Sequence, residues 1–315
     1  MNTPAPVLLE KILATERRVL AYSSVAGSFW EKKFRRLFQL HYKYVIFFIC
    51  KLLNLPIKKT VTLFWGEKIT VPFNDIAISN LYYFGCLSKK ELPLIKYLIK
   101  HLKVDDVFYD IGANYGFYTH LSKEIITSGS CHLFEPNERV FSYVARNMAV
   151  VPPVVLNNCA VSDNNGTLDF YREVDNGSSG TGTTKADVTK SWRRHYTKTR
   201  VNSQTLDTYI TNHPVPTIMK LDVEGAEINV LKGAVQLLET YQPTIAMEVW
   251  SGKKGADHSE PAVAFLLERG YLAYRLDGEG GAHLVADVDT SAIASSLQNF
   301  LFQKPVTSLS TESLE

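Results

Sequence analysis

The stretch Val107-Phe108-Tyr109-Asp110-Ile111-Gly112-Ala113-Asn114-Tyr115-Gly116 indicates how this chain folds. Its apolar and aromatic start predicts the end of a buried strand, Asp110 stands at the tip of that strand, and two glycines bracket a tight loop. Phe117 then begins a helical pattern. A strand, a glycine loop and a helix in this order present backbone N–H groups at a helix N-terminus, and the carboxylate accepts hydroxyl or ammonium donors. We therefore expect a site for an adenosine-like cofactor.

The spacing of the glycines narrows the choice of cofactor. Gly112 and Gly116 form G-x-x-x-G, whereas a dinucleotide fingerprint is G-x-G-x-x-G, in which the central glycine lets the backbone approach a pyrophosphate. The stretch also differs from the G-x-x-x-x-G-K-[ST] loop that binds nucleoside triphosphates. Further along, His132–Pro136 predicts a second strand that ends in Glu135, whose carboxylate would accept hydrogen bonds from both ribose hydroxyls.

The combined pattern is similar to one known class of enzymes. Asp-x-Gly-x-x-x-Gly followed by a glutamate such as Glu135 resembles the pattern of class I S-adenosylmethionine (SAM) methyltransferases. The alternative interpretation is an ordinary glycine-bearing turn between a strand and a helix.

The composition is that of a globular chain and excludes some classes of function. The 315 residues are 45% hydrophobic and 21% charged, and the formal net charge of +2 argues against a dedicated nucleic-acid binder. The first 28 residues lack the pattern of a signal peptide, so the cytoplasm is the expected compartment. Four cysteines lie far apart without C-x-x-C spacing, and we expect them to be reduced core residues: Cys50, Cys86, Cys131 and Cys159.

Residues 1–60 differ in character from the rest of the chain. Glu31–Ile57 is rich in basic and aromatic residues, and Tyr44–Cys50 within it is continuously apolar. The apolar stretch is shorter than the roughly twenty residues that span a bilayer. Two interpretations remain open for residues 31–57. One is a helix packed on the domain or on a second subunit of a homo-oligomer. The other is a helix lying at the inner face of a membrane, where it meets lipid headgroups or a lipid-linked substrate.

From Asp106 onward, strand and helix patterns alternate, which predicts a mostly parallel sheet with helices on both faces. A β-hairpin over 60–71 and a helix over 91–102 are expected to lead into this core. The last two expected strands should form an antiparallel pair. After Glu135 the expected elements are a helix, strands 154–161, 166–171, 217–222 and 244–250, helices 226–238 and 259–269, and strands 271–276 and 282–286.

Acidic residues stand at the ends of several expected core strands. Asp110, Glu135 and Asp222 end successive strands, and Glu248 ends another. In an open α/β sheet, ligands bind in the crevice outside the carboxyl ends of the strands. A buried carboxylate must be paired or hydrogen-bonded, so four acids at equivalent places indicate a site. For each acid the alternative is a helix cap, and Asp222 in particular precedes a helix expected to start near Gly225.

At this point the chain resembles the FkbM family of SAM-dependent methyltransferases, over about residues 104–276. The resemblance implies a Rossmann-like class I methyltransferase sheet, mostly parallel with an antiparallel last strand and helices on both faces, to which residues 1–60 add a helical extension. It also implies O-methylation of hydroxyls on sugars or related secondary metabolites. The motifs that carry it are Phe108–Gly116, Phe134-Glu135-Pro136, Ala160-Val161-Ser162-Asp163, Lys220-Leu221-Asp222-Val223-Glu224-Gly225-Ala226-Glu227, and Glu248.

We expect four parts of the chain: the extension 1–60, a hairpin and helix over 61–103, the methyltransferase domain 104–304 and a disordered tail 305–315.

Matching positions within the family pattern implies a role for each candidate residue. The residues expected to hold SAM are Asp110, Gly112, Ala113, Asn114 and Gly116 at the methionine end, Glu135 and Pro136 at the ribose, Asn158, Cys159 and Ala160 near the adenine, and Asp222 beside the methyl group.

Methyl transfer is an in-line displacement from a sulfonium, so positioning of the reactants supplies most of the catalysis. An alcohol nucleophile must also lose its proton, and a general base contributes about 10²–10⁴-fold. The candidate bases are Asp222 and Glu224, with His195 third. A magnesium ion held by Asp222, Glu224 and Glu248 is the alternative. We favour the interpretation in which these acids orient SAM and cap helices without a metal.

The acceptor stays open at this stage. The basic stretch Lys185–Arg200, which contains His195, would meet a phosphate or carboxylate on a sugar, and its alternative is a solvated charged face. Two rival classes of function are a nicotinamide-dependent oxidoreductase on a similar sheet and a non-catalytic relative that binds a membrane or a partner. The first would not explain the block 222–227, and the intact strand-end acids argue against the second.

Overall fold

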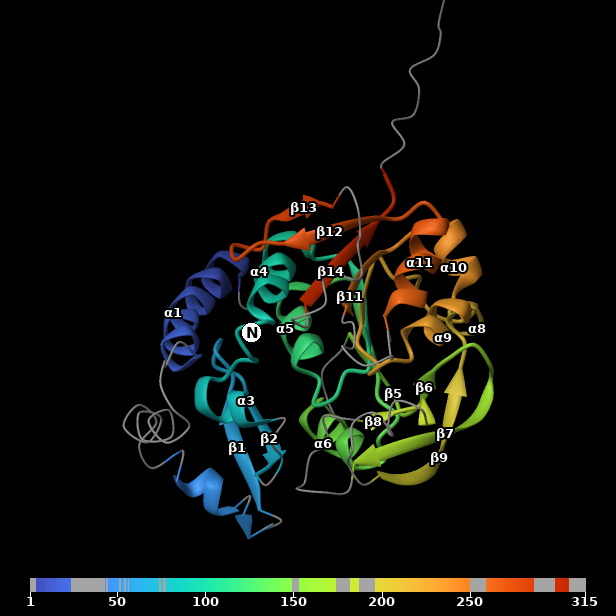
Figure 1. The fold of residues 1–315 in the computed structure, drawn as a ribbon. Coiled ribbons are helices and arrows are strands. Elements are labelled where there is room, and N and C mark those ends of the chain that lie inside the picture. The colour runs from blue at the N-terminus through green and yellow to red at the C-terminus, as the bar shows by residue number, and fades with distance from the viewer. Residues whose placement is uncertain are drawn as a thin grey trace, which may run out of the picture.

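A mostly parallel sheet of eight strands forms the centre of the molecule (Figure 1). The computed structural model describes residues 4–23, 43, 45–50, 52–53, 55, 57–73, 75, 78–148, 153–173, 182–186, 196–249, 259–285 and 298–305. The order across the sheet is β13-β12-β14-β11-β10-β3-β4-β5. These strands are β3 (Val107–Ile111), β4 (Ser130–Phe134), β5 (Val154–Asn157), β10 (Ile218–Leu221), β11 (Thr244–Val249), β12 (Leu272–Leu276), β13 (Ala282–Leu284) and β14 (Gln298–Gln303).

The pairing confirms the predicted Rossmann-like sheet with an antiparallel last strand. Strands β5, β4, β3, β10 and β11 pair parallel with one another, and β14 is antiparallel to both β11 and β12. The four residues of β10 are all buried, as expected for a parallel strand covered on both faces. The predicted antiparallel pair near the end of the domain is also present, since β12 pairs with β13.

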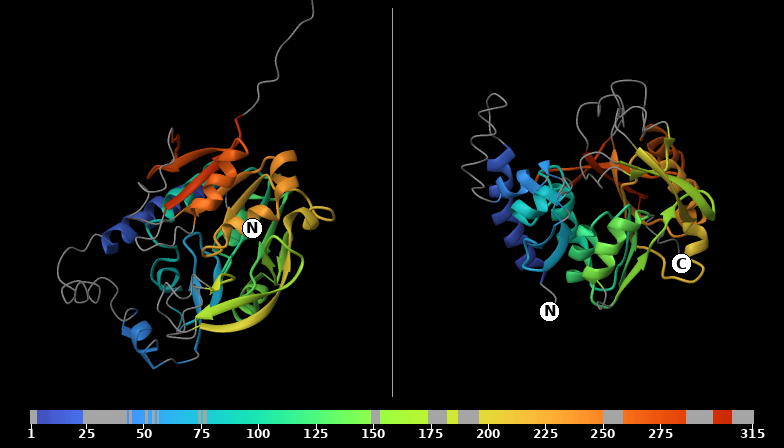
Figure 2. Two further views of the ribbon diagram at one scale, coloured as in Figure 1. Left: turned by 45° about the vertical axis from the view of Figure 1, so that its right-hand side comes forward. Right: turned by 90° about the horizontal axis from the view of Figure 1, so that it is seen from below.

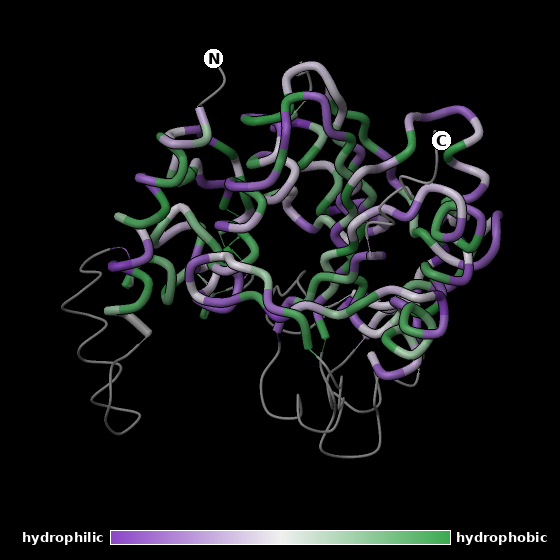
Figure 3. Tube along the Cα trace, turned by 90° about the horizontal axis from the view of Figure 1, so that it is seen from above, coloured by the Kyte–Doolittle hydropathy of each residue, from purple (hydrophilic) through white to green (hydrophobic). Residues whose placement is uncertain are grey.

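Helices cover both faces of this sheet, as the alternating pattern predicts (Figure 2). Neighbouring residues of one strand serve opposite faces: Phe108 belongs to one hydrophobic cluster and Tyr109 to the other. Hydrophobic and hydrophilic residues alternate along the outer helices (Figure 3), as expected of helices that pack one face against a core. The first cluster includes α1 (Ala5–Ser23), α4 (Leu92–His101) and α5 (Phe117–Ile125), and the second includes α8 (Leu206–Tyr209), α9 (Glu227–Lys232), α10 (Val235–Thr240) and α11 (Glu260–Glu268).

Two smaller sheets flank the central one. The predicted hairpin is formed by β1 (Lys58–Thr62) and β2 (Lys68–Pro72), which pair antiparallel and contact α3 (Ser79–Phe84) and α6 (Glu138–Met148). A four-stranded sheet has the order β6-β9-β7-β8. Its strands are β6 (Ala160–Val161), β7 (Gly166–Glu173), β8 (Gly182–Thr183) and β9 (Tyr196–Gln204).

The structure differs from the expected elements in four details. The strand expected over 154–161 is two strands, β5 and β6, which belong to different sheets. The end of the basic stretch lies on a strand that was not predicted, because Lys198 and Arg200 belong to β9. The helix expected over 226–238 is broken into α9 and α10 at Gly233, where a Cβ atom would lie 2.0 Å from the carbonyl oxygen of Ser162. Strand β14 was not predicted.

Other expectations concern residues outside the described ranges. These are most of the basic stretch 185–195 with His195, and the tail from residue 306. Of the N-terminal extension, the structure describes α1 and a helical segment over 45–50, which lies at the edge of the molecule beside β1 in both Figure 1 and Figure 2. Across the described ranges, no helix combines the length and the apolar character needed to cross a bilayer.

The chain changes direction in the middle of the sheet, and the loops diverge there. From β3 it proceeds to β4 and β5 on one side, whereas β10 and β11 lie on the other side of β3. Such a switch point opens a crevice at the carboxyl ends of the two central strands. The two loops also approach closely, because a Cβ atom on Gly112 would lie 1.9 Å from the carbonyl oxygen of Asp222, and the φ of Gly112 is +78°.

We expect Gly112→Ala to lower the free energy of unfolding by about 3 kcal/mol, because it adds both a left-handed backbone penalty and an overlap with the backbone of Asp222. Gly278→Ala is the matched control, since a Cβ atom there meets no atom within 4 Å. Thermal and urea unfolding of the two variants measure the difference. Equal stability of the two variants would contradict the close approach.

Candidate active site

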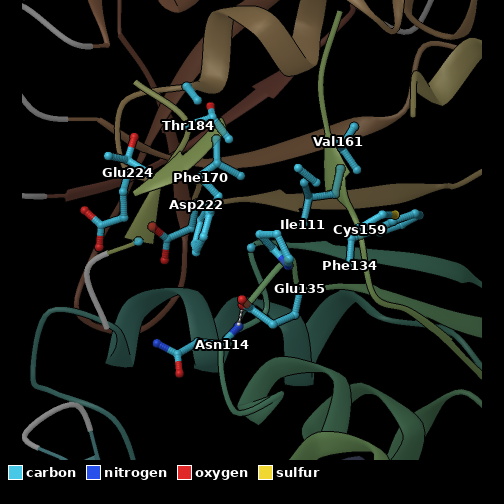
Figure 4. A pocket seen from close by; sticks show the side chains of 17 residues that line it. Ile111, Asn114, Phe134, Glu135, Cys159, Val161, Phe170, Thr184, Asp222 and Glu224 are labelled. Carbon is cyan, nitrogen blue, oxygen red and sulfur yellow. Dashed lines mark hydrogen bonds between the residues drawn. The ribbon is translucent and has the colours of Figure 1, made fainter. Parts of the chain in front are cut away.

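A cavity opens at the switch point, between the carboxyl ends of β3, β4 and β10 (Figure 4). It encloses about 650 Å³, part of it open to solvent. The central sheet contributes Gly112 and Asn114 after β3, Glu135 after β4, and Asp222 and Glu224 after β10. The loops after three strands that are distant in sequence therefore meet in one cavity, as the strand-end acids predict.

The glycine loop uses its backbone amides to hold itself against β4. The N–H groups of Gly112 and Ala113 both donate to the carbonyl oxygen of Phe134, at 3.0 and 3.1 Å. Asn114, whose φ is +52°, donates its N–H to Oε2 of Glu135 at 2.9 Å. Gly116 has a φ of +73° and forms the N-cap of α5. Three amides of the loop are thus engaged with the neighbouring strand rather than with a ligand.

Glu135 is buried at the tip of β4 with its carboxylate in the cavity (Figure 4). Its Oε1 accepts a hydrogen bond from the N–H of Asn137 at 2.7 Å, and its Oε2 accepts the one from Asn114. Burial raises the pKa of this carboxyl to about 7. Each oxygen keeps a second lone pair, so the group can still accept donors from a ligand such as a diol.

Asp110 lies deeper than the sequence pattern implies. It is fully buried and does not line the cavity. Its Oδ2 accepts hydrogen bonds from the backbone N–H and the hydroxyl of Thr119, at 3.0 and 2.7 Å, which ties β3 to α5. Burial raises the pKa of Asp110, and the ammonium group of Lys220 opposes this shift. Asp110 thus holds the start of the loop, and its buried Oδ1 has no hydrogen-bond partner among the described residues, so its contact with SAM stays a prediction.

The residues expected near an adenine separate into two groups. Cys159 and Ala160 line the cavity, together with Pro136, and form an apolar wall. Asn158 does not line it, because its side-chain amide donates to the backbone oxygen of Glu135 at 2.8 Å. Asn158 therefore braces the loop after β4 from behind.

One wall of the cavity comes from the four-stranded sheet, and sequence analysis missed it. Phe170 of β7 and the segment Gly182–Thr184 around β8 line the side opposite β3. A Cβ atom on Gly182 would lie 2.2 Å from the ring of Phe170, so this glycine lets the two strands meet closely. The alternating apolar pattern of β7 was the available signal, but its position relative to the cavity depends on long-range pairing.

Asp222 is held by a buried lysine on the same strand. Nζ of Lys220 lies 2.8 Å from Oδ2 of Asp222, and the lysine side chain is 4% exposed, against 32% for the aspartate. Burial lowers the pKa of Lys220, but Asp222, Asp110 and Glu91 outweigh this effect and raise it above its usual value. Asp222 does not cap α9, whose N-cap is Ala226 without a side-chain hydrogen bond. The helix-cap alternative for Asp222 was therefore wrong.

Glu227 braces the loop that carries Asp222 and Glu224. The side chain is buried, and its Oε1 accepts hydrogen bonds from the N–H groups of Val223 and Gly225, both at 3.2 Å. Glu224 has a φ of +54°, a conformation that needs such support from its surroundings. Burial raises the pKa of Glu227 to about 7. This residue belongs to the block 220–227, but the sequence alone indicated no role for it.

A second cavity lies on the other side of Gly112, Asn114 and Asp222, which line both. Residues of α3, α5 and the segment before α4 complete it, including Glu91. Oε2 of Glu91 accepts hydrogen bonds from the hydroxyl of Tyr118 at 2.6 Å and from the side-chain amide of Asn299 at 3.0 Å.

Glu248 at the end of β11 is influenced by the same acids. Burial, followed by the charges of Asp222, Glu91 and Glu224, raises its pKa well above the usual range. This shift favours the protonated form of the Glu248 carboxyl. Within the described ranges, no cluster of three or more His, Cys, Asp or Glu side chains is arranged to hold a metal ion.

Comparison with known proteins places this chain in a family. The FkbM methyltransferase domain matches residues 110–273, which is more than half of the chain. Over 163 residues the chain is 27% identical to hexuronic acid methyltransferase AglP of Haloferax volcanii, covering 51% of this chain and 63% of that protein. Over 151 residues it is 28% identical to 2-O-methyltransferase NoeI of Sinorhizobium fredii, covering 43% and 60%. The matches span less than two thirds of both relatives.

A solved structure shows a more distant likeness. Methyltransferase FkbM from Methylobacillus flagellatus aligns with a TM-score of 0.39 at 16% identity, over 64% of this chain and 44% of that chain.

The buried carboxyl of Glu227 should make the free energy of unfolding depend on pH. Its pKa is about 7 in the folded protein and about 4.3 in an unfolded chain. Because the folded state binds the proton more tightly, wild-type protein loses stability as the pH rises from about 4.5 to about 7. Glutamine does not titrate. The free energy of unfolding of Glu227→Gln minus that of the wild type should therefore increase, by about 3 kcal/mol at most, as the pH rises over this range.

Urea unfolding at several pH values measures this difference. Glu268→Gln is the control, because Glu268 is exposed and its substitution should leave a constant offset. A pH-independent offset for Glu227→Gln as well would show that the carboxyl is not held in the buried environment described.

Proposed function

Because the chain belongs to the FkbM methyltransferase family, we propose that it transfers a methyl group from SAM to a hydroxyl group of a sugar or a related acceptor. One observation carries the proposal more than any other. The buried carboxylate of Glu135 lies in the cavity at the end of β4, beside a glycine loop that it holds in place. A carboxylate after the second strand of such a sheet is suited to the two hydroxyls of a ribose.

The residues around the cavity fit SAM at each end. Glu135 would take the ribose hydroxyls, and the apolar wall of Pro136, Cys159 and Ala160 would receive the adenine. Asn114 lines both cavities, and its buried Oδ1 has no hydrogen-bond partner among the described residues. An unsatisfied buried acceptor is costly, so this oxygen is suited to the ammonium group at the methionine end. Gly112 has no side chain, so the backbone is accessible beside Asn114 where the two cavities meet.

The rival cofactor fits less well. A pyrophosphate needs free backbone amides at the glycine loop, but those of Gly112, Ala113 and Asn114 already donate to Phe134 and Glu135. This arrangement favours a cofactor without phosphate groups. It supports SAM over a nicotinamide dinucleotide.

Bound SAM supplies an electrophilic methyl group on a sulfonium. The protein would orient the acceptor hydroxyl in line with it and remove the proton. We assign the second task to Asp222, because it lines both cavities and its ion pair with Lys220 fixes the direction of the carboxylate. The hydroxyl becomes strongly acidic only as the new C–O bond forms, so a nearby carboxylate can accept its proton at that stage. Glu224 lines only the first cavity, and we assign it to acceptor binding.

The sugar acceptor is supported by the relatives. One is named for methylation of a hexuronic acid and the other for 2-O-methylation. We combine the two names, methylation of a sugar acid and methylation of an oxygen, and extend the combination to this chain. Incubation of a host extract with methyl-labelled SAM, followed by mass spectrometry of the labelled product, identifies the acceptor.

We expect Glu135→Ala to weaken SAM binding about 30-fold or more, because it removes a charged acceptor of two hydrogen bonds. Isothermal titration calorimetry measures the affinity. Glu138→Ala is the matched control: this exposed acid lies three residues further on, at the start of α6, and its loss should leave the affinity unchanged. Binding of NAD but not of SAM by the wild-type chain would overturn the proposal.

Replacing the assigned base should affect turnover. We expect Asp222→Asn to lower kcat by about 10²–10⁴-fold, the usual contribution of a general base. Glu224→Gln should lower kcat by less than about tenfold and act mainly on the KM of the acceptor. Incorporation of labelled methyl into the identified acceptor measures both. A larger loss of kcat in Glu224→Gln than in Asp222→Asn would transfer the role of the base to Glu224.

A further inference from the structure

An apolar surface is exposed on the N-terminal part of the molecule. Between residues 45 and 57, seven large apolar side chains lie at the surface, with exposed fractions from 39% to 71%. Contiguous exposed apolar residues of this kind mark an interaction site more often than an ordinary surface. We call this surface the apolar patch; it consists of Val45, Ile46, Phe48, Ile49, Leu52, Leu53 and Ile57.

The opposite side of the same segment is fixed to the body of the protein. Phe47 and Cys50 are buried. The ring of Phe47 lies 5.4 Å from that of Phe73, between the centroids, and 5.7 Å from that of Tyr83. The segment over 45–50 is therefore a helix with one face packed on α3 and the other face exposed. Packing on the domain, one of the two sequence interpretations, accounts for only two of its six apolar residues.

The charge around the patch is of one sign. Between Glu31 and Glu67 the sequence contains eight lysines and arginines and no acidic residue. Among them, Lys58 and Lys59 directly follow the patch on β1 and are exposed. The rest of the chain has 26 basic residues, out of a total of 34, against all 32 acidic ones. The stretch of sequence that carries the apolar patch is thus strongly basic, whereas the rest of the chain has more acidic than basic residues.

We propose that the apolar patch docks on a lipid bilayer with anionic headgroups. An amphipathic segment with an apolar face and flanking lysines binds in the interfacial plane of such a membrane. Each lysine near an anionic surface adds to the attraction. A second copy of the chain fits less well, because it would bring two surfaces of the same positive charge together.

The position of the patch relates this docking to the second cavity. Phe47 contacts Tyr82 and Tyr83 of α3, and Asn80 and Leu81 of the same helix line the cavity. Docking would hold this cavity close to the lipid surface. If the proposed function is correct, the acceptor hydroxyl belongs to a sugar carried on a lipid.

Sedimentation of the full chain with vesicles tests the docking. We expect binding to phosphatidylcholine vesicles that contain phosphatidylglycerol, weakened by salt, and little binding to phosphatidylcholine alone. Leu52→Ser with Leu53→Ser should weaken binding about tenfold or more, because two exposed leucines no longer enter the interface. Lys58→Glu with Lys59→Glu should weaken it by at least about fivefold per residue.

Leu284→Ser is the matched control, since Leu284 is 58% exposed on β13 and lies outside the patch. Its binding should equal that of the wild type. Unchanged binding of the double leucine variant, or no binding of the wild type, would overturn the proposal. So would a wild-type dimer, measured by analytical ultracentrifugation, that becomes a monomer in the leucine variant. Calorimetry with SAM in the absence of vesicles shows separately whether the proposed function holds.

Discussion

The buried ammonium group of Lys220 is the constraint on which the site depends. A charge in the interior is tolerated only when it is paired, and unpaired it would cost several kcal/mol. Lys220 lies opposite Asp110 in the register between β10 and β3, forms an ion pair with Asp222, and lies 5.0 Å from the centre of the ring of Tyr118. Because this buried ammonium group must be paired, the ends of β3 and β10 are held together beside it. The loops that follow the two strands diverge just beyond this point.

The two loops at this point are held in the same manner. At each, a buried carboxylate accepts two backbone N–H groups. Glu135 accepts one from the loop after β3 and one from the loop after β4. Glu227 accepts both from the loop after β10. Because the supports are buried, the cavity walls keep their shape without a ligand, which reduces the ordering cost of binding. Burial disfavours the charged form of both carboxylates. The free energy that keeps them in place therefore comes from the packing of the surrounding fold.

Local patterns were sufficient to predict what depends on nearby residues. The strand ends, the glycine loop and the acids Glu135 and Asp222 all follow from runs of a few residues, and the structure brings these two acids into one cavity. What depends on tertiary contacts was not predicted. The expected helix is broken at Gly233, where the chain approaches Ser162 closely, and Asp110 is held below the cavity by Thr119 of the following helix. Phe170 reaches the cavity only through the pairing of β7 with β8 and β9.

The place of β14 has a consequence for how the protein is made. This strand, near the end of the sequence, lies between β11 and β12 and pairs with both. Until residue 303 has left the ribosome, the facing edges of those two strands have no partner. Unpaired strand edges template aggregation. The nascent chain therefore carries the completed loops of the cavity on an open sheet until β14 emerges, and its solubility during synthesis depends on that strand.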